Sequence, residues 1–236
     1  MSYKAKAVIL AGGRGKRMGE FTRNTQKCLL PVDGTPALLH VMQSLDESLG
    51  PVETIICVSY GAASVEEFVR RNKPARMETS FIADEGKSDD LSILSNLKDM
   101  LRDKFIWLAG DVIALPELYS NSLSTLTSGN FVGSVSLSPK LDEATTHPIG
   151  KVSEGKIVEL IYPPPPIFGD GYLRDMTVWA LDTKIFRFMG NGTTIFSLLR
   201  RAMDVGYDVA SNIYSKQWVH LGYPDDLRKT MTSEDN

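Results

Sequence analysis

Residues 5–38 read AKAVILAGGRGKRMGEFTRNTQKCLLPVDGTPAL, and this stretch decides the fold of the chain. An apolar run over residues 7–11 predicts a buried strand that passes directly into a loop containing Gly12, Gly13 and Gly15. The same loop carries three basic residues, and a further one, Lys27, follows ten positions after Arg17. Glycines let backbone N–H groups approach phosphate oxygens, and cationic side chains neutralise phosphate charge. The stretch therefore predicts a polyphosphate-binding loop at the carboxyl end of a strand.

The bulk properties of the chain are those of an ordinary globular protein. Its 236 residues suffice for one large domain, which we expect to cover residues 1–230, with a flexible tail at 231–236. A net charge of -3 gives no electrostatic reason to expect nucleic-acid or membrane partners. The chain has no run of about 20 apolar residues, and Cys28 and Cys57 form no metal-binding or disulfide pattern. We expect no N-terminal leader, because the first residues lead directly into a predicted strand. We therefore expect a cytoplasmic location.

Apolar runs alternate with helical patterns through the first half of the chain. The expected strands are residues 4–10, 54–58, 78–83 and 105–109, and the expected helices are residues 37–49, 64–72 and 91–101. This order predicts an α/β protein, a three-layer α/β/α fold with a Rossmann-like, mostly parallel sheet. Ligands of such sheets bind at the carboxyl ends of the strands, here after Leu10 and Ala109.

The second half is richer in strands. We expect strands at residues 131–137, 151–161 with a turn at Glu154-Gly155, 176–181, 209–213 and 217–221, and helices at 184–189 and 194–205. The four prolines at 163–166 indicate a surface or edge segment because proline cannot donate a backbone hydrogen bond. These patterns predict a small β-rich insertion.

Four segments together resemble the sugar-phosphate nucleotidyltransferases. Residues 10–18, LAGGRGKRM, are similar to that family's LAGGxGTRL signature, and residues 22–32, TRNTQKCLLPV, to its TxxxPKxLLPV segment. Residues 108–111, LAGD, resemble its metal-binding strand end, and residues 218–227, WVHLGYPDDL, resemble its WxDIGTPEDL element. The glycine-rich loop alone would be a weak signal, whereas the four matches span nearly the whole chain.

The resemblance implies transfer of a nucleotide. A phosphate oxygen of an acceptor attacks the α-phosphate of a nucleoside triphosphate, and pyrophosphate leaves. On this basis Arg17 would bind the β- and γ-phosphates, Lys27 would lie near the α-phosphate or the acceptor phosphate, and Asp111 would hold Mg²⁺. The residues expected to form the nucleotide-binding loop are Leu10, Ala11, Gly12, Gly13, Gly15 and Lys16. Residues 1–130 would form the nucleotide-binding half and residues 131–230 the acceptor-binding half.

Two positions near the expected phosphates depart from the family pattern. Lys16 replaces the threonine of the signature, which adds a cation and removes a hydroxyl. His220 stands where the family has its second metal-binding aspartate. Imidazole suits softer ions than Mg²⁺. Either Asp111 carries the metal with water and phosphates, or His220 shifts the metal preference toward Mn²⁺ or Co²⁺, or catalysis is weak. The alternative is that His220 is a structural histidine on a half-buried strand.

The base and acceptor sites also differ from the family. Asp89 and Asp90 replace a glycine-containing base-recognition loop, and either can accept a hydrogen bond from a base amino group or cap the following helix. On the acceptor side, Gly110 and Gly150 match glycines of the family, and Lys151 or Arg174 can supply a phosphate partner. The usual EKP motif is replaced by Tyr162-Pro163-Pro164, and the NxG motif by Asp175-Met176-Thr177.

Several functions stay open on these residues. The acceptor can be a sugar 1-phosphate or a polyol or amino-alcohol phosphate, while the spacing from Arg17 to Lys27 argues against a molybdopterin acceptor. A catalytically impaired, nucleotide-binding regulatory subunit is a further alternative, and fold analogy allows a homodimer. A dinucleotide-binding oxidoreductase is disfavoured because Met18 occupies the place of the third glycine in GxGxxG.

Overall fold

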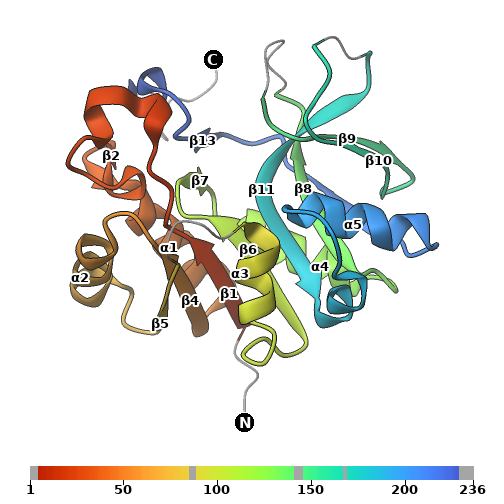
Figure 1. Cartoon of the computed structure of the whole chain (residues 1–236), viewed down its shortest axis with the longest axis horizontal. Helices are drawn as coiled ribbons and strands as arrows, with labels where there is room; N and C mark the ends of the chain where they lie inside the picture. Colours follow the sequence, from red (N-terminus) through yellow and green to blue (C-terminus); the bar gives the residue numbers. More distant parts are fainter. Residues whose placement is uncertain (1–4, 85–88, 141–145, 167–168, 229–236) are drawn as a thin grey trace. The chain divides into compact units, whose positions relative to one another are not determined.

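The structure is a computed structural model that describes residues 5–84, 89–140, 146–166 and 169–228. These residues divide into two compact units that interleave along the chain (Figure 1). The first unit combines the described residues up to 84 with residues 108–117 and 216–228, and the second contains the rest. The predicted tail, residues 231–236, lies outside the described residues.

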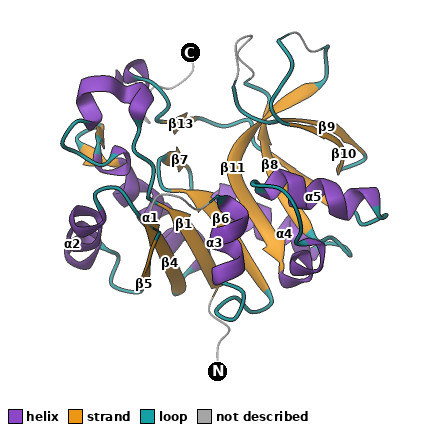
Figure 2. Cartoon of the chain, viewed as in Figure 1, coloured by secondary structure: helices purple, strands orange, loops and turns teal. Residues whose placement is uncertain are grey.

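The first unit contains three parallel strands in the order β5-β4-β1, namely β5 (Glu78–Ala83), β4 (Val52–Val58) and β1 (Ala5–Leu10). Strand β1 pairs with β4 from Ala5 opposite Val52 to Leu10 opposite Cys57. Helices α1 (Ala37–Leu49) and α2 (Ala62–Asn72) connect this region, and the alternation of strands and helices can be followed in Figure 2. The predicted helix at 37–49 and strand at 78–83 are confirmed with identical bounds.

Short segments complete the first unit. The 3-10 helices Lys16–Thr22 and Lys27–Leu29 follow β1, and a small hairpin joins β2 (Pro31–Val32) to β3 (Thr35–Pro36). Strand β7 (Val112–Ala114) pairs antiparallel with β13 (Trp218–His220), and the 3-10 helix Pro224–Arg228 follows. A buried cluster joins these segments: Met18, Leu30, Val32, Ala37, Ile113, Val219 and Leu221. Met18, the residue that breaks the GxGxxG pattern, is therefore a core residue that anchors the loop.

The second unit is built on mixed strand pairings. Strand β11 (Tyr172–Asp182) pairs antiparallel with β8 (Gly133–Ser138), and β8 pairs parallel with β12 (Val209–Ile213). The hairpin of β9 (Ile149–Ser153) and β10 (Lys156–Ile161) turns at the predicted Glu154-Gly155 and pairs with both β11 and β12. Strands β5, β4 and β1 are parallel, whereas the second unit combines antiparallel pairs with the parallel pair β8–β12, so the prediction of a mostly parallel sheet is not confirmed. The α/β class is confirmed, and the three-layer arrangement stays a prediction.

Helices of the second unit include α3 (Asp90–Asn96), α5 (Ile195–Asp204) and the 3-10 helix Thr183–Phe188. The predicted helix at 91–101 ends earlier because Leu97 N–H is shared between the carbonyls of Ile93 and Leu94, and the chain continues in turns. Strand β6 (Lys104–Ala109) begins in the second unit and ends in the first, while α4 (Glu117–Thr127) begins in the first and continues in the second. None of the helices in the part of the chain that the structure describes is long and apolar enough to cross a bilayer.

Candidate active site

The backbone of the loop after β1 passes close to the end of β4 and the residues that follow it. Ala11 N–H donates to the carbonyl of Cys57 at 2.8 Å, which carries the β1–β4 pairing one residue beyond the strand. A Cβ atom at Gly12 would lie 2.8 Å from the Cβ of Ser59, closer than side-chain atoms approach. Gly12 is therefore required by the close passage of the loop after β4.

Gly15 turns the loop into its 3-10 helix. Its φ of 61° lies in the left-handed region, and an added Cβ would lie 2.9 Å from Thr22 Cγ2 and 3.0 Å from Lys27 Cβ. Its carbonyl accepts hydrogen bonds from Met18 N–H at 2.8 Å and from the Thr22 hydroxyl at 2.9 Å. Gly13, in contrast, has open space around its Cα, so this part of the loop backbone can be approached.

Gln26 ties the loop to the segment that carries Lys27. Its buried side-chain amide donates to the carbonyls of Ala11 at 2.7 Å and Gly13 at 2.9 Å, and its carbonyl oxygen accepts from Cys28 N–H. Both ends of the amide are thereby used, which holds the loop backbone in one conformation. Gln26 is not among the residues predicted from the sequence, although the family motif has proline at this position and that departure was a usable signal.

The exposed basic residues of the loop lie against tyrosine rings. The Arg14 guanidinium carbon lies 5.4 Å from the centre of the Tyr60 ring, and that of Arg17 lies 5.0 Å from the centre of the Tyr223 ring. Arg17 Nη1 also donates to the Tyr223 hydroxyl at 3.4 Å. Lys16 is exposed as well, so the predicted cationic side chains lie on the accessible side of the loop.

Lys27 and Asp111 form an ion pair in a nearly buried setting. The Lys27 ammonium contacts Asp111 Oδ2, and their side chains are 17% and 8% exposed. Gly110 N–H donates to the Leu10 carbonyl at 2.9 Å, and a Cβ at Gly110 would lie 3.1 Å from that carbonyl oxygen. The absence of a side chain at Gly110 therefore lets Asp111 stand directly beside the end of β1.

His220 reaches the same carboxylate. Its Nε2 lies 3.5 Å from Asp111 Oδ2, and Leu221 N–H donates to the Asp111 carbonyl at 3.2 Å. The β7–β13 pairing, with His220 opposite Val112, places the two segments in this register. The structure thus brings together within the first unit Leu10, Ala11, Gly12, Gly13, Gly15, Lys16, Arg17, Lys27, Gly110, Asp111 and His220.

Asp111 is the one carboxylate of this cluster that could hold a magnesium ion, because its neighbours Lys27 and His220 have no oxygen donors. Among the described residues, no group of three His, Cys, Asp or Glu side chains forms a metal site by itself. Mg²⁺ in phosphoryl-transfer sites is held by one or two carboxylates together with phosphate oxygens and water. Asp111 supplies such a carboxylate, whereas the His220 imidazole is not an oxygen donor and adds nothing to the fit for Mg²⁺.

The two cysteines are structural. Both are buried free thiols, and burial raises the pKa of Cys28 above its usual value and the pKa of Cys57 to about 12. The thiolate is the reactive form of cysteine. The adjacent Lys27 therefore does not make Cys28 a nucleophile.

In the second unit, Asp89 and Asp90 are engaged at helix ends. Asp89 is the N-cap of α3, and its Oδ1 accepts from Ser92 N–H at 2.8 Å. The Asp90 carboxylate accepts a hydrogen bond from the backbone of Ile195, the first residue of α5. Burial and the neighbouring Asp89 raise the pKa of Asp90 to about 6. Both carboxylates therefore have a structural function, and contact with a base stays a prediction.

Gly150, Lys151 and Arg174 lie on adjacent strands. Lys151 is opposite Tyr172, with its ammonium 5.6 Å from the centre of that ring, and Arg174 is opposite Ile149. A Cβ at Gly150 would lie 3.3 Å from Leu137 Cδ1, so close packing already explains this glycine. The pairing of β9 with β11 brings the three predicted acceptor residues to one region of the second unit.

A bulge in β11 follows Arg174 directly. The register of β11 with β8 shifts between Asp175 and Trp179, and Thr177 within the bulge has φ 56°, an unusual value for a β-branched residue. Buried Asp175 accepts from Trp179 Nε1 at 2.6 Å and from Thr177 N–H at 2.9 Å. Burial raises the pKa of Asp175 to about 7. From the sequence, Asp175 was recognisable only as a departure from the family motif, and its part in the bulge was not predicted.

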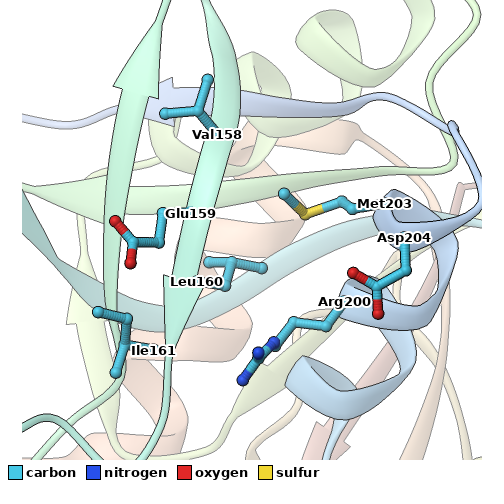
Figure 3. A pocket seen from close by; sticks show the side chains of 7 residues that line it. All are labelled: Val158, Glu159, Leu160, Ile161, Arg200, Met203 and Asp204. Carbon is cyan, nitrogen blue, oxygen red and sulfur yellow. The ribbon is translucent and has the colours of Figure 1, made fainter.

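A hollow of about 310 Å³ lies between β10 and α5 in the second unit. Figure 3 shows the side chains that line it: Val158, Glu159, Leu160, Ile161, Arg200, Met203 and Asp204. It contains none of the residues predicted from the sequence. The candidate active site therefore rests on the residues around β1 and not on this hollow.

Sequence comparison finds relatives of this chain among known proteins. The "Bifunctional protein GlmU" of Methanococcus maripaludis is 20% identical over 231 residues, which cover 94% of this chain and 52% of the relative. A probable glucose-1-phosphate cytidylyltransferase of Bacillus subtilis is 38% identical over 63 residues, 27% of this chain and 24% of that protein. The chain thus spans about half the length of the first relative.

Solved structures show the same fold. The inositol-1-phosphate CTP transferase from T. maritima superposes with a TM-score of 0.77 at 20% identity, covering 94% of this chain and 91% of that chain. The family model of the MobA-like NTP transferase domain matches residues 7–149, which include the glycine-rich loop, Lys27 and Asp111. This chain belongs to the family of MobA-like NTP transferase domains.

Proposed function

We propose that the protein transfers a nucleoside monophosphate from a nucleoside triphosphate to a phosphorylated small-molecule acceptor and releases pyrophosphate. An acceptor phosphate oxygen forms a bond to the α-phosphorus while the bond from that phosphorus to the β-phosphate oxygen breaks. The observation that carries the proposal is the meeting of Lys27 and Asp111 beside the glycine-rich loop of an NTP transferase family member. Family membership supports the reaction class, and the contact between Lys27 and Asp111 supports the choice of these two residues.

Positioning and charge neutralisation are the main tasks in such a reaction. The open backbone at Gly13 and the exposed Lys16 and Arg17 bind the β- and γ-phosphates, which become the leaving group. The Lys27 ammonium, held by Asp111, faces the charge that the acceptor and α-phosphate bring together. When bound at Asp111, Mg²⁺ supplies further neutralisation and Lewis-acid polarisation of phosphate oxygens.

For the acceptor we propose a sugar 1-phosphate, with a polyol or amino-alcohol phosphate as the alternative. Gly150, Lys151 and Arg174 are the residues proposed for this side of the reaction. The names of the Bacillus subtilis and T. maritima proteins support glucose 1-phosphate and inositol 1-phosphate as first acceptors, and CTP as first triphosphate.

The test is pyrophosphate release from each of ATP, GTP, CTP, UTP and dTTP with a panel of sugar, polyol and amino-alcohol phosphates. Each pair is assayed with Mg²⁺ and then with Mn²⁺, and Lys27→Ala serves as the blank. Release that requires one triphosphate, one acceptor and Lys27 supports the proposal. Triphosphate binding without release from any pair contradicts it and favours a regulatory nucleotide-binding subunit.

A further inference from the structure

We propose that Tyr223 is a positioning residue that holds the Arg17 guanidinium in place for triphosphate binding, an inference that rests on the proposed function. The WxDIGTPEDL element of the family has threonine where this chain has Tyr223. Arg17 lies over the tyrosine ring at 5.0 Å and donates to its hydroxyl at 3.4 Å. A threonine side chain provides no ring for this contact.

The backbone around Tyr223 is held by a buried carboxylate. Asp226 Oδ2 accepts from Tyr223 N–H at 2.7 Å and from Gly222 N–H at 2.8 Å, and Asp226 N–H donates back to the Tyr223 carbonyl at 3.0 Å. Two residues upstream, Leu221 N–H binds the Asp111 carbonyl. Tyr223 therefore stands on a segment fixed to the same residue that contacts Lys27.

The contact with Tyr223 is compatible with phosphate binding by Arg17. A guanidinium has five N–H donors, and the hydrogen bond to the Tyr223 hydroxyl uses one of them. A long, exposed arginine otherwise loses considerable rotamer freedom when it binds a ligand. A ring that already restricts Arg17 reduces that loss, so Tyr223 increases the affinity for a triphosphate.

The other arginine of the loop, Arg14, also lies over a tyrosine ring. Arg14 lies over the Tyr60 ring at 5.4 Å, and the Tyr60 hydroxyl donates to the Arg23 carbonyl at 3.1 Å. Tyr60 comes from the loop after β4 and Tyr223 from the segment after β13, so two separate elements each place a ring beneath a loop arginine. The repetition favours a function of the rings in presenting the arginines.

The test measures binding of inorganic tripolyphosphate and of CTP to the full chain by calorimetry. We expect Tyr223→Leu and Tyr223→Thr to weaken binding about two- to fivefold, the range that an exposed cation–π contact produces. Tyr223→Phe, which keeps the ring, should bind within about twofold of wild type. In turnover, Tyr223→Leu should raise KM for the triphosphate and leave kcat unchanged, because the stack supports ground state and transition state alike.

Double variants show whether Tyr223 acts through Arg17. In the Arg17→Met protein, adding Tyr223→Leu should cause no further loss of affinity. In the Arg23→Met protein, which lacks a different charge of the same segment, adding Tyr223→Leu should cause the full loss of affinity. Equal binding by wild type and Tyr223→Leu, or the same loss without Arg17, overturns the inference while leaving the proposed function intact. Failure of wild type to bind either tripolyphosphate or any triphosphate overturns both.

Discussion

At the scale of single residues, the Lys27–Asp111 pair explains why two motifs distant in sequence act together. Each charge is nearly buried, and a buried charge is tolerated only with a partner. Gly110 makes the meeting possible because it has no side chain to separate Asp111 from β1. The arrangement places one cation and one carboxylate beside the glycine-rich loop.

Lys27→Ala should lower turnover by about 100-fold or more, because it removes a preorganised cation from the charge that develops during transfer. Steady-state kinetics with the active substrate pair measure this loss, and a thermal melt shows whether the fold persists. Arg23→Ala is the matched control, since Arg23 pairs with Glu20 at the surface and lies outside the proposed site. Unchanged turnover of Lys27→Ala would remove Lys27 from the reaction.

His220→Asp should shift the metal preference toward Mg²⁺, because it places a second carboxylate beside Asp111 and so offers the metal a second oxygen ligand. The ratio of activities with Mg²⁺ and Mn²⁺ is the measurement, with Asp111→Asn as the variant expected to weaken dependence on either ion. An unchanged ratio would show that His220 packs against Asp111 as a structural residue.

Among the elements, the start of α3 allows a test of whether Asp89 only caps the helix or also contacts the nucleotide base. Asp89→Ala removes the N-cap and should cost about 1 kcal/mol of stability, whereas Asp89→Ser keeps a capping oxygen and should be nearly neutral. Urea unfolding measures both values. If Asp89→Ser also leaves the relative affinities for CTP, GTP, ATP and UTP unchanged, the predicted contact of Asp89 with the base is wrong.

The β11 bulge should make stability depend on pH. The pKa of Asp175 is about 7 in the folded protein, above its ordinary value near 4, so the folded state binds the proton more tightly than the unfolded state. The stabilising contribution of protonated Asp175 is therefore lost as pH rises from about 4 to about 7. Asp175→Asn should flatten the pH dependence of the free energy of unfolding across this window. Parallel profiles for wild type and Asp175→Asn would contradict this assignment.

At the scale of the whole molecule, the elements could be predicted from sequence better than their pairing. Apolar runs identified most strands because burial leaves a local pattern, and the helix Ala37–Leu49 has the expected bounds. The mixed pairing of β11, β8 and β12 has no such local signature, because the local apolar pattern of a strand does not specify the direction of its neighbours. The 3-10 segments and β7 are too short to show a period.

The site could be predicted in outline and not in its supporting contacts. Arg17, Lys27 and Asp111 lie in segments that resemble motifs of the family, and all three belong to the first unit. Gln26 and Tyr223 depend on partners distant in the chain, so no local pattern reveals that one holds the loop and the other lies beneath Arg17. The interleaving of the two units along the chain is likewise a property of tertiary contacts.

Nucleotide transfer is tested most directly by following the label from two radioactive forms of the active triphosphate. We expect the label of α-³²P-labelled triphosphate to enter an acceptor-linked product, and the label of the γ-³²P form to leave as pyrophosphate. Both transfers should be absent in Lys27→Ala. Transfer of the γ-label to the acceptor would show a kinase, and retention of both labels in a bound triphosphate would show a binding protein. Either result would contradict nucleotide transfer.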